Sequence, residues 1–130
     1  MALATRITAK YQVTLPRQVR KLMKARITAV STSILLGELR YAYLREDKPG
    51  FEVALAAIRE NTRLVDVTIS LAIHAAELRK KYSSRKTAFS YNDGLYLATA
   101  ITEKATLLVT TAPHFLTASE VKAITPKEFK

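Results

Sequence analysis

The sequence has no cysteine, no tryptophan, only three glycines and no long apolar run. Without cysteine, a disulfide framework, a thiolate metal site and a cysteine nucleophile are all excluded. No apolar stretch approaches the roughly 20 residues that a membrane-spanning helix needs. The N-terminus also lacks the apolar region of a signal peptide. These absences argue against export and against a membrane partner, and they favour a cytoplasmic location.

Acidic residues are missing from the first part of the chain, where Glu38 is the first to occur. Over the whole sequence, 21 Lys and Arg stand against 11 Asp and Glu, which gives a net charge of +10. Such an excess favours polyanionic partners, among which nucleic acid is the commonest. The basic residues crowd the N-terminal segment: Arg6, Lys10, Arg17, Arg20, Lys21, Lys24 and Arg26.

The remaining pattern predicts an α/β fold. At 130 residues the chain is about one domain, which is long enough for a hydrophobic core. Short apolar runs alternate with helical patterns, and this alternation is typical of a parallel sheet with right-handed crossovers. The predicted strands are 27–31, 63–67, 106–110 and 120–124, and the predicted helices are 33–45, 51–60, 69–82 and one that starts at Ser90.

The most informative stretch contains that last helix and the strand after it. Ser90 can cap the helix, and Asp93 stands three residues later, where a capping box needs a carboxylate. The strand is almost continuously apolar and leads into a loop that holds Ala112 and no acid. In open parallel sheets, functional groups collect at the carboxyl ends of strands. We therefore expect the site near this loop.

These residues resemble the C-terminal half of PIN-domain proteins, and most closely the toxin of VapBC-type toxin–antitoxin pairs. In that family an Asp heads a helix reading D-A-x-x-x-A-T-A, and a strand then ends in T-x-D-x-x-F. Here the first motif reads DGLYLATA from Asp93, and the second reads TTAPHF from Thr110, with Ala112 at the position of the acid. Upstream, AVSTSILLGELRY resembles the family's second strand and a helix with a metal-binding Glu, here Glu38. The resemblance covers about residues 26–129.

The resemblance implies a PIN-like three-layer sandwich, a mostly parallel sheet flanked by helices, with metal-dependent endoribonuclease activity. Acids that converge at strand ends can hold Mg²⁺ or Mn²⁺ against a phosphodiester and generate hydroxide. Glu38 and Asp93 match the family's metal ligands, and together with Thr110 they are the expected catalytic residues. The family's first strand ends in an Asp that has no counterpart before Glu38, and Ala112 replaces another acid. With two of four acidic positions absent, we expect a weakly bound cation and impaired cleavage.

The basic N-terminal segment, about residues 4–24, resembles the first half of an AbrB/MazE-type swapped-hairpin DNA-binding domain. The matching signature is QVTLP, followed by a basic turn with Arg17 and Arg20. In that family a dimer presents arginines to DNA, but the second half of the domain has no counterpart here. We therefore expect a partial AbrB-like segment at 1–25 and a PIN-like domain at 26–130.

The PIN-like part needs a central strand that the resemblance does not supply. Residues 5–15 alternate apolar and polar side chains, as a half-buried strand does. An open edge in the middle of a sheet is not tolerated. We therefore expect this segment to fill the central position or to pair with a neighbouring chain.

Three functions remain open from the sequence. The chain is a weakened toxin-type ribonuclease, an inactive PIN-like module that binds RNA or a protein, or a DNA-binding regulator that uses its N-terminus. An antitoxin-like partner and a homodimer are expected from the resemblance. Glu38 and Asp93 should share a pocket beside Thr110 and Ala112, whereas His114 fits an ordinary surface position in the loop. The side chains expected to contact nucleic acid are Arg40, Arg45, Lys80, Lys81, Arg85 and Lys86 for RNA, and Arg17 and Arg20 for DNA.

Overall fold

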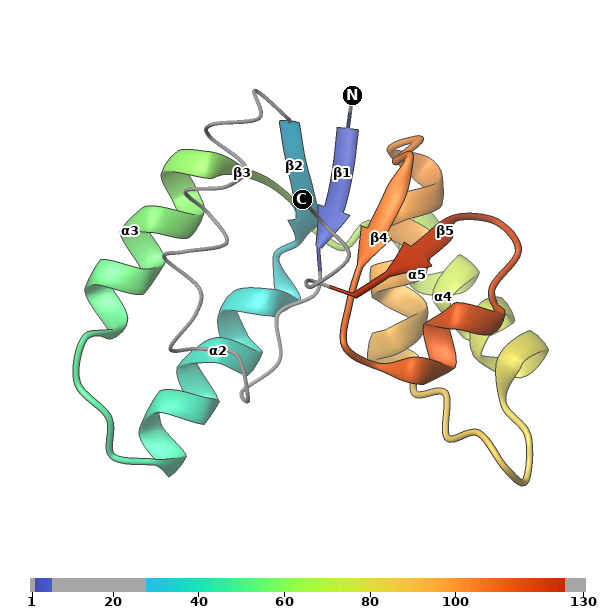
Figure 1. The fold of residues 1–130 in the computed structure, drawn as a ribbon, viewed down its shortest axis with the longest axis horizontal. Helices are drawn as coiled ribbons and strands as arrows, with labels where there is room; N and C mark the ends of the chain where they lie inside the picture. Colours follow the sequence, from blue (N-terminus) through green and yellow to red (C-terminus); the bar gives the residue numbers. More distant parts are fainter. Residues whose placement is uncertain (1, 6–27, 126–130) are drawn as a thin grey trace.

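Five parallel strands form the centre of the fold in a computed structural model that describes residues 2–5 and 28–125 (Figure 1). The strand order is β3-β2-β1-β4-β5, and each neighbouring pair is parallel. The strands are β1 (Ala2–Thr5), β2 (Thr28–Thr32), β3 (Thr62–Val65), β4 (Leu107–Val109) and β5 (Lys122–Ile124). The helices are α2 (Ile34–Arg45), α3 (Phe51–Asn61), α4 (Ile69–Tyr82), α5 (Tyr91–Thr102) and the short 3₁₀ helix η2 (Pro113–Thr117).

The central position of the sheet is filled from the N-terminus of the chain. β1 pairs with β2 on one side and with β4 on the other. The sequence pattern predicts this strand at residues 5–15. Only Thr5 of that range belongs to β1, and residues 6–15 lie outside the described part of the chain. β1 contains no acid, so it brings no carboxylate to the site.

Helices α4 and α5 begin at local signals that the sequence carries. The Thr68 hydroxyl caps α4 by accepting a hydrogen bond from the Leu71 N–H at 3.1 Å. Ser90 and Asp93 form the predicted capping box at the start of α5, in which each side chain accepts from the other residue's backbone N–H. Both helices therefore start within one residue of the predicted position.

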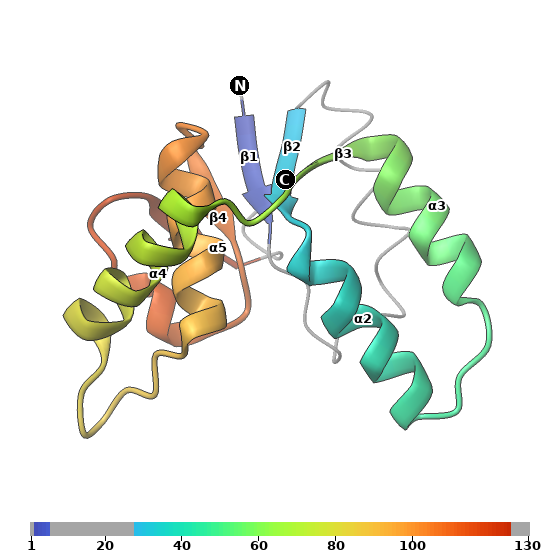
Figure 2. The same cartoon turned by 180° about the vertical axis from the view of Figure 1, so that it is seen from behind.

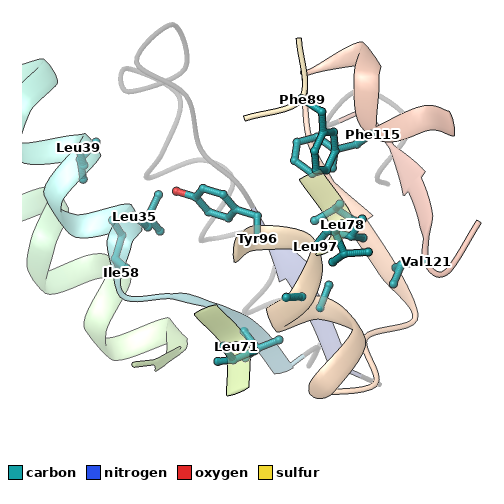
Figure 3. Packing of buried hydrophobic residues seen from close by; sticks show 14 of the residues in the cluster. Leu35, Leu39, Ile58, Leu71, Leu78, Phe89, Tyr96, Leu97, Phe115 and Val121 are labelled. Carbon is teal, nitrogen blue, oxygen red and sulfur yellow. The ribbon is translucent and has the colours of Figure 1, made fainter. Parts of the chain in front are cut away.

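The hydrophobic core lies between the sheet and these helices. Gly94 of α5 lies directly against the backbone of Ala75 in α4, so the two helices pack closely. Figure 2 shows this helix pair covering one face of the sheet. Figure 3 shows the buried side chains that join the elements, among them Leu35, Ile58, Tyr96, Leu97 and Phe115. Among the described helices, none has the length and apolar character needed to cross a membrane.

The predicted α/β class with a parallel sheet is confirmed, and every predicted helix is present. The sequence pattern does not predict η2, which follows β4 where only a loop was expected. Because α5 leads through a tight turn into β4, the two elements run in opposite directions. The first turn of α5 therefore lies at the carboxyl end of β4, the edge where function was expected.

Candidate active site

Asp93 is held at this edge by the start of α5. It is 2% exposed, and its Oδ2 accepts a hydrogen bond from the Ser90 N–H at 2.8 Å. In return, the Ser90 hydroxyl accepts from the Asp93 N–H at 3.0 Å. A carboxylate in the first turn also interacts favourably with the positive end of the helix dipole. Asp93 is thus both a predicted site residue and a structural part of α5.

His114 lies against Asp93 and is the main residue that the sequence interpretation missed. Its Nε2 is 3.0 Å from Asp93 Oδ2, and its side chain is only 22% exposed. The imidazole packs between aromatic rings, with centroid distances of 5.7 Å to Phe89 and 4.9 Å to Phe115. The surface position expected for His114 is therefore wrong, because η2 turns the residue inward toward α5. The available signal was its position two residues after Ala112, in the loop where the site was expected.

Glu38 also contacts α5, and it does so through Tyr96. The Tyr96 hydroxyl donates a hydrogen bond to Glu38 Oε1 at 2.5 Å. Tyr96 is 2% exposed, and Figure 3 shows its hydroxyl pointing toward α2, near Leu35. Asp93 and Tyr96 are three positions apart on α5, which places them on one face of the helix. Nothing in the sequence pattern indicates the Tyr96 contact.

Thr110 and Ala112 complete the carboxyl end of β4. Thr110 is 2% exposed, and its hydroxyl accepts a hydrogen bond from the Ala112 N–H at 3.1 Å. Its own N–H donates to the Ile124 carbonyl at 2.9 Å, which continues the pairing with β5. In the structure Thr110 shapes the turn after β4, and a catalytic role for it stays a prediction. Ala112 is half-buried and supplies no ligand atom from its side chain.

Two residues of α5 thus contact elements that carry predicted site residues. His114 joins Asp93 to the loop after β4, and Tyr96 joins Glu38 to the same helix. Each contact lies beyond a strand's carboxyl end, as expected for this class of sheet. That Glu38 and Asp93 share one pocket stays a prediction.

The described residues do not fit a divalent metal ion. Hard cations such as Mg²⁺ need several oxygen ligands, usually with more than one carboxylate. In residues 2–5 and 28–125, no three His, Asp or Glu side chains gather closely enough to hold a metal. Glu38 and Asp93 are two carboxylates, and each has protein partners at one oxygen: Tyr96 for Glu38, and Ser90 and His114 for Asp93. The predicted pair of metal ligands therefore lacks the further acid that would complete a site.

The basic side chains expected to bind RNA are all exposed. On α2, the Arg40 guanidinium lies 4.9 Å from the centroid of the Phe51 ring. The Arg45 guanidinium lies 5.8 Å from the centroid of the Tyr41 ring. Tyr41 itself is 65% exposed. Lys81, at the end of α4, is bound to Glu120 with an Nζ–Oε2 distance of 3.2 Å. Lys80, Arg85 and Lys86 are exposed near the same end of α4, and Arg17 and Arg20 lie outside the described residues.

The sequence that forms these elements matches a known protein family. A family model described as the PIN domain matches residues 14–120, which is most of the chain. The chain belongs to the PIN-domain family. The match begins within the segment that resembled an AbrB/MazE-type domain, and none of the similarities found supports that second resemblance. The boundary predicted between residues 25 and 26 stays a prediction.

Solved structures share the fold of this PIN domain at low sequence identity. VapBC2 from Rickettsia felis, bound to a DNA fragment from its promoter, has a chain that is 20% identical with a TM-score of 0.67. That alignment covers 96% of this chain and 98% of the other. A toxin–antitoxin complex from Klebsiella pneumoniae is 17% identical with a TM-score of 0.66, covering 97% and 98% of the two chains. VapBC-1 from nontypeable Haemophilus influenzae is 13% identical with a TM-score of 0.69, covering 98% and 99%. No curated protein matches the sequence.

Proposed function

We propose that this chain is a VapC-like PIN-domain protein that binds RNA through exposed basic side chains and whose metal-dependent cleavage of RNA is impaired. The proposal rests on the residues found at the carboxyl end of β4. His114 lies against Asp93 there, and Ala112 adds no carboxylate. The family indicates nuclease chemistry, and the residues present indicate that this chemistry is weakened.

Binding to RNA is supported by charge. No acid occurs between Glu77 and Asp93, whereas that interval contains the cluster at the end of α4 and the loop before α5. That loop leads directly into the helix that holds Asp93, so a phosphate chain bound to it approaches the site. We call Lys80, Arg85 and Lys86 the loop cations, since they are exposed and have no acidic partner among the described contacts.

A salt titration of RNA binding tests this part of the proposal. Cations that contact phosphates release counterions, so log K falls linearly with log salt, by about 0.7 per contact for single strands. Replacing the three loop cations with Gln should reduce that slope by about 2. The matched control replaces Arg59, Arg63 and Lys104 with Gln, which removes the same charge elsewhere. Equal losses in both triple variants would show that the loop cations are not an interface.

Cleavage is tested by restoring the absent acid with Ala112→Asp. Ala112 has φ −79° and ψ 114° and precedes η2 as its N-cap, a position that favours Asp. The substitution should therefore be tolerated locally, and we expect it to raise a wild-type cleavage rate that is barely measurable in Mg²⁺ or Mn²⁺. Ala112→Asn is the control, because it has the same shape without the charge. Brisk wild-type cleavage that ignores Glu38→Gln and Asp93→Asn would show that the catalytic site lies elsewhere.

An antitoxin-like protein is the partner we propose. The three solved structures named above are VapBC or toxin–antitoxin complexes, and their fold is shared over nearly the whole chain. Apolar side chains exposed on α2 and α3 give such a partner a surface to cover: Tyr41, Leu44 and Val53. Co-expression with an antitoxin of this class, followed by purification of a stable complex, tests the pairing. Loss of the complex in Leu44→Glu with retention in Ile69→Glu, on α4, would locate it.

A further inference from the structure

We propose that Tyr96 and His114 act as the protein's own partners for Glu38 and Asp93, and that they hold these two carboxylates in place of a divalent cation. The inference starts from the mismatch between the family's expected metal and the residues described here. It does not depend on whether RNA is the ligand. It goes beyond the proposed function because it gives the carboxylates a defined state and predicts how the cation site can be opened.

Tyr96 is held where its hydroxyl donates a hydrogen bond to Glu38. Its ring is 2% exposed and belongs to the hydrophobic core, so the hydroxyl has a fixed position. The hydrogen bond to Glu38 Oε1 is 2.5 Å long, as is typical when an O–H donates to a carboxylate. The contact is partly buried, since Tyr96 is buried and Glu38 is half-buried, and a hydrogen bond shielded from water is stronger than one in water. A cation that drew Glu38 away from α5 would have to break this bond.

Asp93 is contacted from two directions, by one hydrogen bond and by one close imidazole nitrogen that makes no hydrogen bond to it. Its Oδ2 accepts the Ser90 N–H that closes the capping box, and the same oxygen lies 3.0 Å from His114 Nε2. The imidazole is itself fixed, because it packs against Phe89 and Phe115. A cation at Oδ2 would compete with both contacts, and it would gain no third acid from Ala112 in return.

The two arrangements differ in what removing a partner does. If Tyr96 and His114 support a bound metal indirectly, removing them weakens binding, typically by about 10–100-fold. If they replace the metal, as we infer, removing them leaves the carboxylates less satisfied and strengthens binding. The sign of the change in affinity therefore decides between the two.

Electron paramagnetic resonance of free Mn²⁺ measures whether the affinity for the ion rises or falls in each variant, and it needs no RNA. The full-length wild-type chain should bind Mn²⁺ more weakly than about 1 mM, below the range of dedicated carboxylate sites. Ala112→Asp should bring binding into the measurable range. Adding Tyr96→Phe or His114→Gln to this variant should tighten Mn²⁺ binding by about tenfold, a change of the size seen for residues beside a metal site.

The control is Tyr91→Phe in the same background, since it removes a hydroxyl from the first turn of the same helix. It should leave Mn²⁺ affinity unchanged, and circular dichroism should show that each variant is folded. Tight Mn²⁺ binding by the wild-type chain would overturn the inference, and so would unchanged or weaker binding in the Tyr96→Phe and His114→Gln variants. Neither result bears on RNA binding. Unchanged or weaker Mn²⁺ binding in the two variants would overturn this inference alone, whereas tight wild-type binding would also count against impaired cleavage.

Discussion

Replacing Gly94 with Ala should destabilise the protein although Ala is the better helix former. Gly94 follows Asp93 in the first turns of α5, where the family motif has Ala. A Cβ built on Gly94 would lie 2.3 Å from the Ala75 carbonyl oxygen, 3.0 Å from its carbonyl carbon and 3.1 Å from its Cα. All three atoms belong to the backbone of α4, so no side chain can turn away to make room.

The expected cost follows from these distances. Ordinary contact between non-bonded heavy atoms is about 3.5 Å, so α4 and α5 would have to separate by roughly 1 Å. Overpacking of this kind costs about 1–3 kcal/mol, and a clash with backbone belongs at the upper end. Helix propensity returns about 1 kcal/mol for Gly to Ala. The free energy of unfolding should therefore fall by about 2 kcal/mol.

Gly37 offers a matched control within the same chain. It lies inside α2, and a Cβ built there meets nothing within 4 Å. Gly37→Ala should therefore gain the helix propensity alone and raise the free energy of unfolding by about 1 kcal/mol. Urea denaturation of both variants, with m-values compared, measures the difference. If Gly94→Ala proves as stable as Gly37→Ala, then the inference that α4 and α5 pack too closely to admit a Cβ at position 94 is wrong.

Two further predictions concern stability. Ser90→Ala removes one half of the capping box and should cost about 1 kcal/mol in urea denaturation, whereas Ser84→Ala, in the loop before α5, should cost less. Burial acts to raise the pKa of Glu120, but hydrogen bonds from Tyr82, its own backbone and Lys81 outweigh it and lower that pKa below 4.5. This stabilisation is present above the unfolded-state pKa and is lost as pH falls through the folded-state pKa. Glu120→Gln should therefore flatten the acid side of the stability–pH curve, and an unchanged curve would contradict this.

The parts of the fold that local signals determine were predictable from sequence. The capping box at Ser90 and Asp93 needs only residues within one turn, so the start of α5 could be located closely. The identity of the central strand could not, because pairing in a parallel sheet joins segments that are distant in sequence. β1 has only four residues, and the stronger alternation farther along the N-terminal segment drew the prediction to residues 5–15.

Motif order identifies Glu38 and Asp93 as candidate site residues, but it does not predict their contacts. Glu38 and Asp93 could be found from motif order, yet the partner of Glu38 lies 58 positions away on α5. No periodicity links such residues before the fold brings them together. His114 was missed for a related reason, since only η2 turns its side chain toward Asp93.

The inference about Glu38 and Asp93 has a general physical basis. An acid that is buried must be compensated by donors or by a cation, because an isolated buried charge is costly. The buried Asp93 receives a backbone N–H and lies against an imidazole, and the half-buried Glu38 receives a phenol hydroxyl. On the inference proposed above, these partners and the absence of an acid at Ala112 leave the pair stable without a cation. The contacts that preserve the shape of the site would then also reduce its affinity for metal, which is how fold and chemistry could separate within one family.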